Sequence, residues 1–425
     1  MKEKILLFLI LLIAITGWLT GCIQIEPPIS TPTIMPTGNR TQAVINDTST
    51  STPILSNVPP VSLTQLLYTP TATLTSFLQN LSTATPTETV FSQSITLSGH
   101  TCAVSRLQWS PDGTLLASSC GFLSTTPPDK TVRLWFRDGE IAHELTGYTQ
   151  PVLSLDWSPD GKALATGAMN GTIRLWSNEG QPLKEWQGNA GNVFAVAWSP
   201  DGEVLASGSI ITVTNPTVQL WDPAGKIIST LSTLFSGGKF YNLAWSPNGE
   251  FLLGGATDYK LWKADGEQVY WLTACPHCTP AWGMAWSPDG KLWAVGNENG
   301  EVEIYNTAGK RVAAMQDRTD VNSLAWSPDS RLLAGAKTVW RTDGTVVANL
   351  NSPAIRVNCV AWSSDGSLLA TGDDDGLIRL FTAEGKPMGI LRGHTGSIDA
   401  LAWSPDGKIL ASGSDDTTIR LWTIK

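Results

Sequence analysis

The sequence has few charged residues, few histidines and no long stretch with helical periodicity. Charged residues make up 15% of its 425 residues, and the net charge is −9. Without an overall basic field the chain has little to hold phosphate groups, so we expect no nucleic-acid partner. Four histidines are present, and no metal cluster or cofactor motif is evident. Gly (39) and Trp (19) are abundant, which favours many short strands over helices.

The first 21 residues have the order of a signal peptide. Lysines flank the start of an apolar run at 5–15, which is shorter than the roughly 20 residues of a membrane-spanning helix. Residues 19–22 read Leu-Thr-Gly-Cys and resemble the lipobox of bacterial lipoproteins. The resemblance implies cleavage before Cys22, lipidation of this residue, and membrane contact through acyl chains outside the cytoplasm. An uncleaved anchor and a plain secretory signal are the alternatives.

Residues 22–91 change in composition to Ser, Thr and Pro. They lack the aromatic content needed to bury a core, so we expect a disordered stalk. At roughly 5 to 6 Å × √n, such a stalk of about 70 residues reaches on the order of 45 Å. The sequence therefore predicts a signal peptide at 1–21, a lipidated stalk at 22–91 and one folded domain at 92–425.

A five-residue motif recurs through the rest of the chain. Trp-Ser-Pro-Asp-Gly begins at Trp109, Trp157, Trp198, Trp286 and Trp403, and three variants of it begin at Trp245, Trp326 and Trp362. Successive copies are 36 to 48 residues apart, close to the roughly 40 to 45 residues of one four-stranded propeller blade. Pro and Asp favour a tight turn, Gly supplies a positive φ, and apolar runs flank the motif, so each copy predicts a hairpin.

The last repeat resembles a WD repeat. Gly393-His394 opens it, and residues 412–422, Ser-Gly-Ser-Asp-Asp-Thr-Thr-Ile-Arg-Leu-Trp, close it. The similarity extends from about Ser92 to Lys425, and it implies an all-β WD-repeat β-propeller. By this resemblance the family's buried hydrogen-bond tetrad would comprise His394, Ser412, Asp416 and Trp422 in the last repeat, and His100, Ser118, Asp129 and Trp135 in the first.

Other repeats depart from the family pattern. Tyr148 and Asn170 stand in the His and Asp places of the second repeat, and the seventh has Asp375 but Phe381 in place of Trp. The fourth, fifth and sixth repeats also deviate. We expect hairpins in all of them without assigning them a complete tetrad.

The two ends of the repeat region are expected to complete one blade together. The final repeat stops at Lys425, directly after its third strand, while residues 93–98 alternate like a strand ahead of the first hairpin. In the family such a strand completes the last blade and removes an open sheet edge. The resulting prediction is a propeller of eight four-stranded blades, closed by an N-terminal strand.

Two groups of residues invite a catalytic or metal-binding interpretation. Ser, His and Asp occur within one repeat, but they occupy tetrad positions, and no Gly-x-Ser-x-Gly elbow supplies a nucleophile. Residues 373–376, Asp-Asp-Asp-Gly, read as a tight turn because the 12-residue spacing of a calcium loop is missing. We therefore expect no enzyme activity, no cofactor and no metal.

The cysteines are expected to have different roles. Cys275-Pro276-His277-Cys278 looks like the motif of periplasmic thiol oxidases, but no helix follows to lower a thiol pKa. A disulfide bracing this loop is expected, with redox activity or metal capture as alternatives. Cys102 and Cys120 flank the first hairpin nearly symmetrically and are expected to form a second disulfide. Cys359 is expected to pack as a small buried residue.

Variation in length falls on one rim of the predicted propeller. The Ser-Pro-Asp-Gly turns are nearly uniform, whereas longer segments occur at 121–128, 210–216, 232–239 and 274–281, on the opposite face. Loops on a rigid scaffold commonly carry recognition, and aromatic and Arg side chains dominate binding energies. Candidate partner contacts are Phe122, Tyr148, Phe235, Tyr241, His277, Trp282 and Arg318. Packing of each against the core is the alternative.

These observations predict an extracytoplasmic scaffold, anchored at the cell envelope, that binds protein partners of unknown identity. Binding of a carbohydrate or small ligand is an alternative, as is an enzyme that uses the central channel.

Overall fold

The computed structural model describes residues 89–91, 94–121, 128–188, 191–210, 216–232, 242–255, 259–272 and 283–424. The predicted signal peptide, the predicted lipidation site Cys22 and residues 22–88 of the predicted stalk lie outside these ranges. Within them the structure contains strands and turns, and no helix that could cross a membrane is found there.

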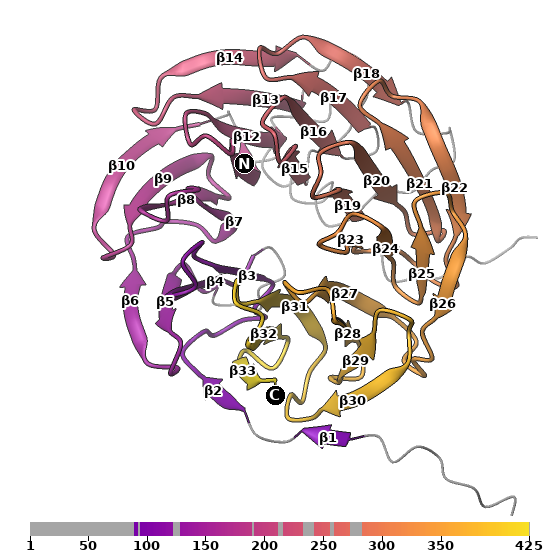
Figure 1. The fold of residues 1–425 in the computed structure, drawn as a ribbon. Helices are drawn as coiled ribbons and strands as arrows, with labels where there is room; N and C mark the ends of the chain where they lie inside the picture. Colours follow the sequence, from indigo (N-terminus) through magenta and orange to yellow (C-terminus); the bar gives the residue numbers. More distant parts are fainter. Residues whose placement is uncertain are drawn as a thin grey trace, which may run out of the picture. The chain divides into compact units, whose positions relative to one another are not determined.

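The described strands form eight sheets arranged in a ring, with the first strand of each blade innermost and the last outermost (Figure 1). Blade 1 consists of β3 (Arg106–Trp109), β4 (Leu115–Ser119), β5 (Val132–Phe136) and β6 (Ile141–Leu145); blade 2 of β7 (Val152–Trp157), β8 (Ala163–Ala168), β9 (Thr172–Ser177) and β10 (Pro182–Gln187); blade 3 of β11 (Asn192–Trp198), β12 (Leu205–Ile210), β13 (Pro216–Trp221) and β14 (Ile227–Ser232); blade 4 of β15 (Asn242–Trp245), β16 (Phe251–Gly255), β17 (Tyr259–Lys263) and β18 (Gln268–Leu272).

The second half of the ring repeats this order. Blade 5 consists of β19 (Gly283–Trp286), β20 (Leu292–Gly296), β21 (Glu301–Asn306) and β22 (Arg311–Gln316); blade 6 of β23 (Ala325–Trp326), β24 (Leu332–Ala334), β25 (Thr338–Arg341) and β26 (Val346–Asn349); blade 7 of β27 (Val357–Trp362), β28 (Leu368–Asp373), β29 (Ile378–Thr382) and β30 (Pro387–Leu391); and blade 8 of β31 (Ile398–Trp403), β32 (Ile409–Ser414) and β33 (Ile419–Thr423), completed by β2 (Ile95–Leu97). The prediction of eight four-stranded blades is confirmed.

The N-terminal strand closes the ring as predicted. β2 pairs antiparallel with β33, with Ile95 opposite Leu421 and Leu97 opposite Ile419. The Leu97 side chain is only 2% exposed and belongs to a core cluster that also contains Val104 of the following connection. Closure therefore covers the outer edge of β33 and buries an apolar side chain at the same time.

A further strand lies ahead of the closing strand. β1 (Thr89–Phe91) pairs in parallel with β30, so blade 7 has a fifth strand on its outer edge (Figure 1). These residues fall within the segment predicted as stalk. The described part of blade 7 therefore includes Thr89–Phe91, three residues that come before the predicted start of the domain at Ser92.

The Ser-Pro-Asp-Gly motif forms a compact turn stabilised by its own side chains. In blade 1 the Ser110 hydroxyl donates to Asp112 Oδ1 at 2.6 Å and accepts a hydrogen bond from the Leu115 amide at 3.0 Å. Gly113 has a φ of 68°, in the left-handed region that favours glycine. Blade 6 keeps the same turn with Ser330 at a φ of 63°, and there the Ser330 hydroxyl accepts a hydrogen bond from the Asp289 amide of blade 5.

The core lies between the blades. One cluster, for example, combines Leu220 and Leu231 of blade 3 with Trp245 and Trp262 of blade 4. Four of the largest side chains are fully buried in this way: Trp262, Trp293, Trp340 and Trp422. Complete burial of one large apolar side chain contributes about 1.5 to 3 kcal/mol to stability. Neighbouring blades cover both faces of inner strands such as β4 and β8, which explains why these strands show little polar alternation.

Candidate functional site

The predicted tetrad of blade 8 is assembled in the structure. His394 Nδ1 lies 2.8 Å from Asp416 Oδ2, and Nε2 lies 2.8 Å from Ser412 Oγ. Trp422 Nε1–H donates to the same Ser412 oxygen at 2.9 Å. Because the carboxylate can only accept, Nδ1 carries the imidazole proton, and the Ser412 hydroxyl donates to Nε2. Burial lowers the pKa of His394 and so favours the neutral ring, although the hydrogen bond to Asp416 opposes this shift.

Blade 1 brings together the corresponding residues. His100 Nε2 lies 2.8 Å from Ser118 Oγ, His100 Nδ1 lies 2.8 Å from Asp129 Oδ2, and Trp135 Nε1–H donates to Ser118 Oγ at 2.8 Å. Both serines, Ser118 and Ser412, are 0% exposed. A substrate cannot reach either hydroxyl, so this geometry ties a connection to its blade and offers no nucleophile.

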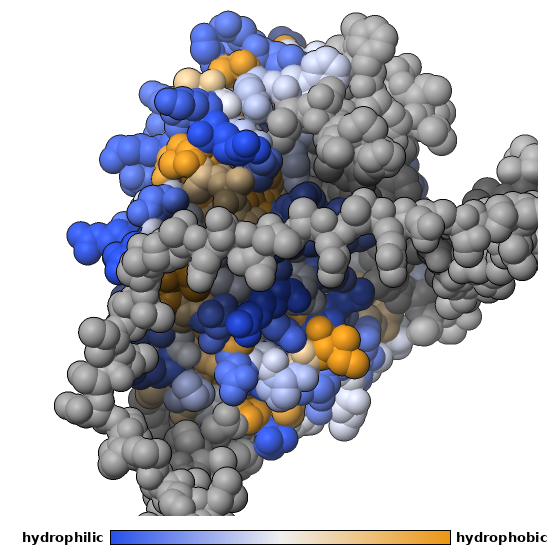
Figure 2. Space-filling model, turned by 90° about the vertical axis from the view of Figure 1, so that its right-hand side faces the viewer, coloured by the Kyte–Doolittle hydropathy of each residue, from blue (hydrophilic) through white to orange (hydrophobic). Residues whose placement is uncertain are grey.

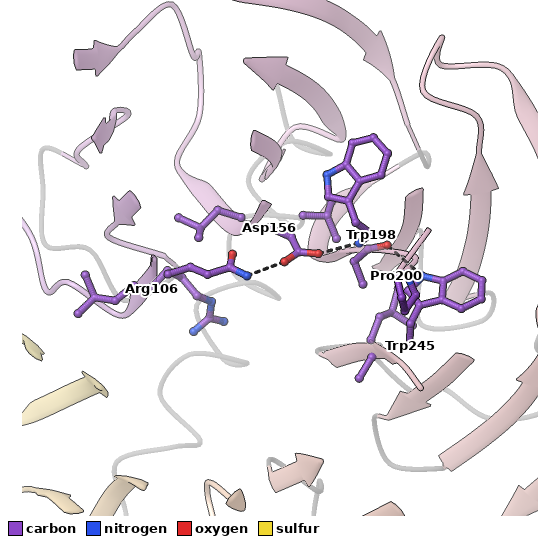
Figure 3. A pocket seen from close by; sticks show the side chains of 12 residues that line it. Arg106, Asp156, Trp198, Pro200 and Trp245 are labelled. Atoms are coloured by element: carbon purple, nitrogen blue, oxygen red, sulfur yellow. Dashed lines mark hydrogen bonds between the residues drawn. The ribbon is translucent and has the colours of Figure 1, made fainter. Parts of the chain in front are cut away.

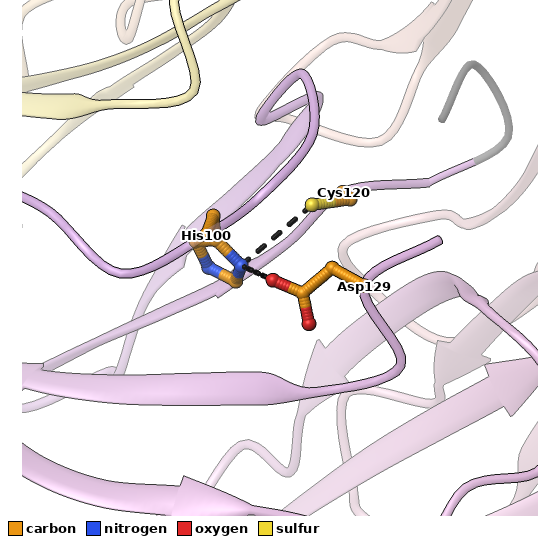
Figure 4. Close-up of side chains that lie close together, drawn as sticks. All are labelled: His100, Cys120 and Asp129. Carbon is orange, nitrogen blue, oxygen red and sulfur yellow. Dashed lines mark hydrogen bonds and ion pairs between the residues drawn. The ribbon is translucent and has the colours of Figure 1, made fainter. Parts of the chain in front are cut away.

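A second interpretation of the blade 1 cluster is a metal site, because ligand atoms of His100, Cys120 and Asp129 lie within 4.8 Å of one another (Figure 4). Cys120, however, forms a disulfide with Cys102 and has no thiolate to offer. Arg133 Nη1 lies 2.9 Å from Asp129 Oδ2 and 2.8 Å from His100 Nδ1. The Arg133 guanidinium already supplies the positive charge that a metal ion would bring to Asp129. We therefore interpret the cluster as one that stabilises the blade.

Tyr148 was predicted as a partner contact, and this prediction is wrong. The side chain is 8% exposed, and its hydroxyl lies 2.7 Å from Thr166 Oγ1. Trp176 Nε1–H donates to the same hydroxyl at 2.6 Å, and the Arg174 guanidinium covers the ring at 4.5 Å from its centre. Tyr148 therefore takes the place of the tetrad histidine and is held inside blade 2.

Blade 7 replaces the tetrad with an ion-pair network. Arg379 pairs with Asp373 and with Asp375, the latter through Nη2 and Oδ2 at 2.6 Å. Ser352 Oγ donates to Asp373 Oδ2 at 2.8 Å, although Asp373 is 0% exposed. Burial raises the pKa of Asp373, and the Arg379 charge opposes this shift. Residues 373–376 form a turn, as expected, and its carboxylates bind the Arg379 guanidinium. The ion pair between Asp373 and Arg379 was not foreseen from the sequence.

The remaining predicted site residues divide into two groups. Arg318 is exposed on the connection into blade 6, and its backbone amide donates to Asp317 Oδ1 at 2.6 Å. Cys359 is buried, as expected, and burial raises its thiol pKa. Outside the described residues lie Cys22, Phe122, Phe235, Tyr241, Cys275, His277, Cys278 and Trp282.

An exposed side chain stands out on the rim that carries the connections into the first strands. Ile355 is 85% exposed, whereas every other exposed large apolar side chain in the described chain reaches 54% at most. Its loop is fixed on both sides: Lys337 Nζ donates to the Ala354 carbonyl at 2.6 Å, and Arg356 Nη2 donates to Asp320 Oδ2 at 3.1 Å. We call Arg318, Asp320, Lys337, Ile355 and Arg356 the rim patch.

The outer side of the ring differs from the rim patch. Figure 2 looks at the side that carries β22 and β26, and its visible described surface shows separate apolar side chains set among hydrophilic ones. Val312 of β22 and Val346 of β26 are 46% and 51% exposed. Single exposed apolar residues of this kind are normal on a protein surface.

A pocket of about 490 Å³ lies on the inner strands of blades 1 to 4 (Figure 3). We call it the axial pocket; its lining comprises Arg106, Leu107, Gln108, Leu155, Asp156, Val196, Ala197, Trp198, Pro200, Leu243, Ala244 and Trp245. Sequence reasoning missed it, although a signal was present. Alanine directly precedes the motif tryptophan in six repeats, whereas the first two repeats have Gln108 and Asp156 there.

Comparisons with known proteins agree with this geometry. A family described as "WDR19 first beta-propeller" matches residues 282–425, and the "WD domain, G-beta repeat" matches 91–135, 139–177 and 180–222. The chain is 31% identical over 115 residues to the rice "Small ribosomal subunit protein RACK1z", covering 24% of this chain and 34% of that protein. It is also 31% identical over 132 residues to the fission yeast "WD repeat-containing protein slp1", covering 29% and 27%. The match thus spans about a third of these relatives.

Two solved structures share the fold. The computationally designed Ika8 protein superimposes with a TM-score of 0.66 at 21% identity, covering 79% of this chain and 99% of that one. Sqt1 of Chaetomium thermophilum superimposes with a TM-score of 0.68 at 20% identity, covering 78% and 98%. At these identities the likeness concerns the fold alone.

Proposed function

We propose that this chain, whose fold is a WD-repeat β-propeller, is a scaffold that binds protein partners through the rim patch and is held at the outside of a cell envelope by lipid on Cys22. WD-repeat propellers in general bind protein partners. The observation that carries the choice of surface is the 85% exposure of Ile355.

The rim patch has the properties of a binding anchor. Ile355 leaves a large apolar side chain in water, and covering such a side chain yields about 1.5 to 3 kcal/mol. Its loop is already held by the Lys337–Ala354 and Arg356–Asp320 hydrogen bonds, so little ordering entropy remains to be lost on binding. The exposed Arg318 belongs to the same patch. A fitting partner would present an apolar pocket beside an acidic group.

Site-specific photo-crosslinking tests this assignment in the full-length protein. A photoreactive phenylalanine analogue at position 355 should capture a partner in intact cells. The matched control places the same analogue at Ser364, which is exposed in the Ser-Ser-Asp-Gly turn of the same blade. Capture from position 355 without capture from 364 supports the rim patch. Equal capture, or capture from 364 alone, contradicts it.

The membrane anchor is tested separately. The sequence Leu-Thr-Gly-Cys at 19–22 supports it, and mass spectrometry of the mature N-terminus should find acyl chains on Cys22. An unmodified Cys22 would refute the anchor and leave the scaffold proposal standing, since the crosslinking experiment does not depend on lipid.

A further inference from the structure

The outer edge of one blade shows how an extended segment can dock on this molecule. β1 pairs in parallel with β30 along the outside of blade 7, with Val90 opposite Ile390 (Figure 1). Gly389, Ile390 and Leu391 are buried there. A short stretch without charge, Thr-Val-Phe, thus adds a fifth strand to a blade.

The outer strand of blade 3 offers the same backbone arrangement without an added strand. Among the described residues no strand lies beyond β14 in its sheet, and Figure 1 shows β14 on the outside of the ring. In both β14 and β30 the register against the third strand of the blade shifts once, near the start of the outer strand. Residues 229–231 therefore stand where residues 389–391, the partners of β1, stand in blade 7.

The composition of β14 distinguishes it from other outer strands. β6 carries Glu144, β10 carries Lys184 and Glu185, and β22 carries Arg311, and charges of this kind hinder the pairing of an edge with another chain. β14 reads Ile-Ile-Ser-Thr-Leu-Ser and has neither a charge nor a proline. At six residues it is the longest uncharged outer strand in the described part of the chain. Such an edge is a template for an incoming strand.

Two adjacent apolar side chains are exposed at the start of β14. Ile227 is 48% exposed and Ile228 is 54% exposed. Within the described ranges they are the one pair of consecutive residues that are both large, apolar and exposed. A strand that continued past residue 229 toward the start of β14 would cover part of this surface, and removing apolar surface from water favours binding.

We propose that the outer edge of β14 binds an extended segment of a partner protein as a fifth strand, in the way that β1 occupies β30. β14 carries no charge to pair with, so the segment is uncharged, and like β1 it is rich in β-branched and aromatic residues. Main-chain hydrogen bonds to β14 supply affinity, and the contact with Ile228 adds to it. This site lies in blade 3 and depends neither on the rim patch nor on the membrane anchor.

A peptide that contains the sequence of β1 tests the site on the full-length protein. The probe is labelled Thr-Val-Phe-Ser-Gln-Ser-Ile-Thr, the sequence of residues 89–96, and fluorescence anisotropy follows its binding. Ile228→Lys puts a charge on the edge and should weaken binding by about tenfold or more. Leu183→Lys is the matched control, since Leu183 has the equivalent place in β10 and is 53% exposed; this variant should bind like the wild type.

Two results would overturn the proposal. The first is that the wild type does not bind the peptide. The second is that Ile228→Lys and Leu183→Lys bind it equally well. Displacement of β1 by the peptide would give the second result, because Ile228→Lys leaves β30 unchanged.

Methylated peptides test whether binding is strand pairing. Alternate amides of a strand point to opposite edges, so N-methyl groups on one alternate set of residues block pairing with β14, and those on the other set leave it intact. One of the two peptides should bind like the parent and the other should lose binding. If both peptides bind, or neither does, the added strand is refuted, since an apolar contact alone would not distinguish them.

A second copy of the chain is the rival occupant of this edge. Sedimentation velocity of the full-length protein at increasing concentration should show no association that depends on Ile228. A dimer that Ile228→Lys abolishes and Leu183→Lys keeps would assign the edge to a second copy and overturn the proposed partner segment.

Discussion

The Nε1–H group of Trp245 donates a hydrogen bond to the carbonyl oxygen of Ala197, 3.1 Å away in the preceding blade. Six other motif tryptophans make the equivalent bond at 3.1 to 3.3 Å: Trp109 to Ala402, Trp157 to Gln108, Trp286 to Ala244, Trp326 to Ala285, Trp362 to Ala325 and Trp403 to Ala361. Trp198 is the exception, since its buried Nε1 has no partner among the described residues. The motif tryptophan thus couples seven of the eight blades to the blade before them.

Replacement of Trp245 by Phe should destabilise the propeller more than replacement of Trp198 by Phe. Both substitutions remove similar volume from a buried site, but only Trp245→Phe leaves a buried carbonyl without its donor. The expected difference in the free energy of unfolding is about 1 to 2 kcal/mol. Urea unfolding followed by tryptophan fluorescence measures it. Equal losses in the two variants would show that the inter-blade bond adds nothing.

Gly309 should tolerate a methyl group much less than Gly249 does. Both glycines have positive φ, 75° and 72°, so alanine strains the backbone equally at either site. A Cβ at Gly309 would come within 2.2 Å of the Tyr270 ring of the preceding blade, whereas at Gly249 the nearest atom is Pro200 Cδ at 3.6 Å.

We expect Gly249→Ala to cost about 1 kcal/mol and Gly309→Ala about 1 to 3 kcal/mol more, measured as shifts in the unfolding midpoint. Similar shifts would mean that the Tyr270 ring moves away without cost, and that this contact does not set the blade spacing.

The elements predicted correctly from the sequence are those that the chain repeats. Trp-Ser-Pro-Asp-Gly marks a turn by local chemistry, and eight copies at one period leave a ring as the way to cover both faces of every sheet. The closing strand at 95–97 was predictable for the same reason, because the last repeat ends one strand short.

Residues that depart from the repeat were harder to interpret. Tyr148 looked like a free aromatic because its burial depends on Thr166 and Trp176, which come from other strands. β1 was missed because three residues with strand propensity carry no signal against a Ser/Thr-rich background, and their partner β30 is about 300 residues away in the chain. The hydrogen bond between Gln108 of blade 1 and Asp156 of blade 2 became visible only when the blades were placed side by side.

The disulfide between Cys102 and Cys120 should contribute strongly to stability, because it closes a loop of 18 residues. Cross-links of this length stabilise a fold by about 3 kcal/mol through the unfolded chain. Cys102→Ser combined with Cys120→Ser should lower the unfolding midpoint accordingly, and a reductant should then have no further effect on the 102–120 hairpin. Cys359→Ser is the control, since this thiol is not cross-linked. Equal stability with and without the bridge would contradict this prediction.

Stepwise truncation should separate the two N-terminal strands. Removal of residues 1–93 takes away β1 and keeps β2, whereas removal of 1–98 also opens the outer edge of β33 and exposes the partners of Leu97. The second truncation should cost at least about 2 kcal/mol more, since burial of the Leu97 side chain alone is of that order. Calorimetry compares the two. If both truncations melt at the same temperature, the ring does not depend on β2.

Acid should lower the free energy of unfolding of the propeller, because the carboxylate and the imidazole of a tetrad both have lowered pKa values in the folded state. Burial tends to raise the pKa of Asp416, but hydrogen bonds from Thr418, the Thr395 amide and His394 outweigh it and lower the pKa from 3.8 to about 2. The folded state therefore binds this proton less readily than the unfolded state. The stabilisation, about 2 kcal/mol, is fully present above about pH 4 and is lost as the pH falls toward 2.

The tetrad histidine acts in the same direction at higher pH. Because burial lowers the pKa of His394 below 6.5, the unfolded chain takes up this proton first, and stability already begins to fall below about pH 6.5. Asp416→Asn should be less stable than the wild type at pH 7 and lose less stability between pH 4 and pH 2. Asp374→Asn, at an exposed aspartate of the blade 7 turn, should follow the wild-type curve. The amide that Asp416→Asn introduces cannot take up a proton, so the variant lacks the contribution of Asp416 to the pH dependence. If the wild type and Asp416→Asn nevertheless lost the same stability between pH 4 and pH 2, the acid sensitivity would lie outside the tetrad.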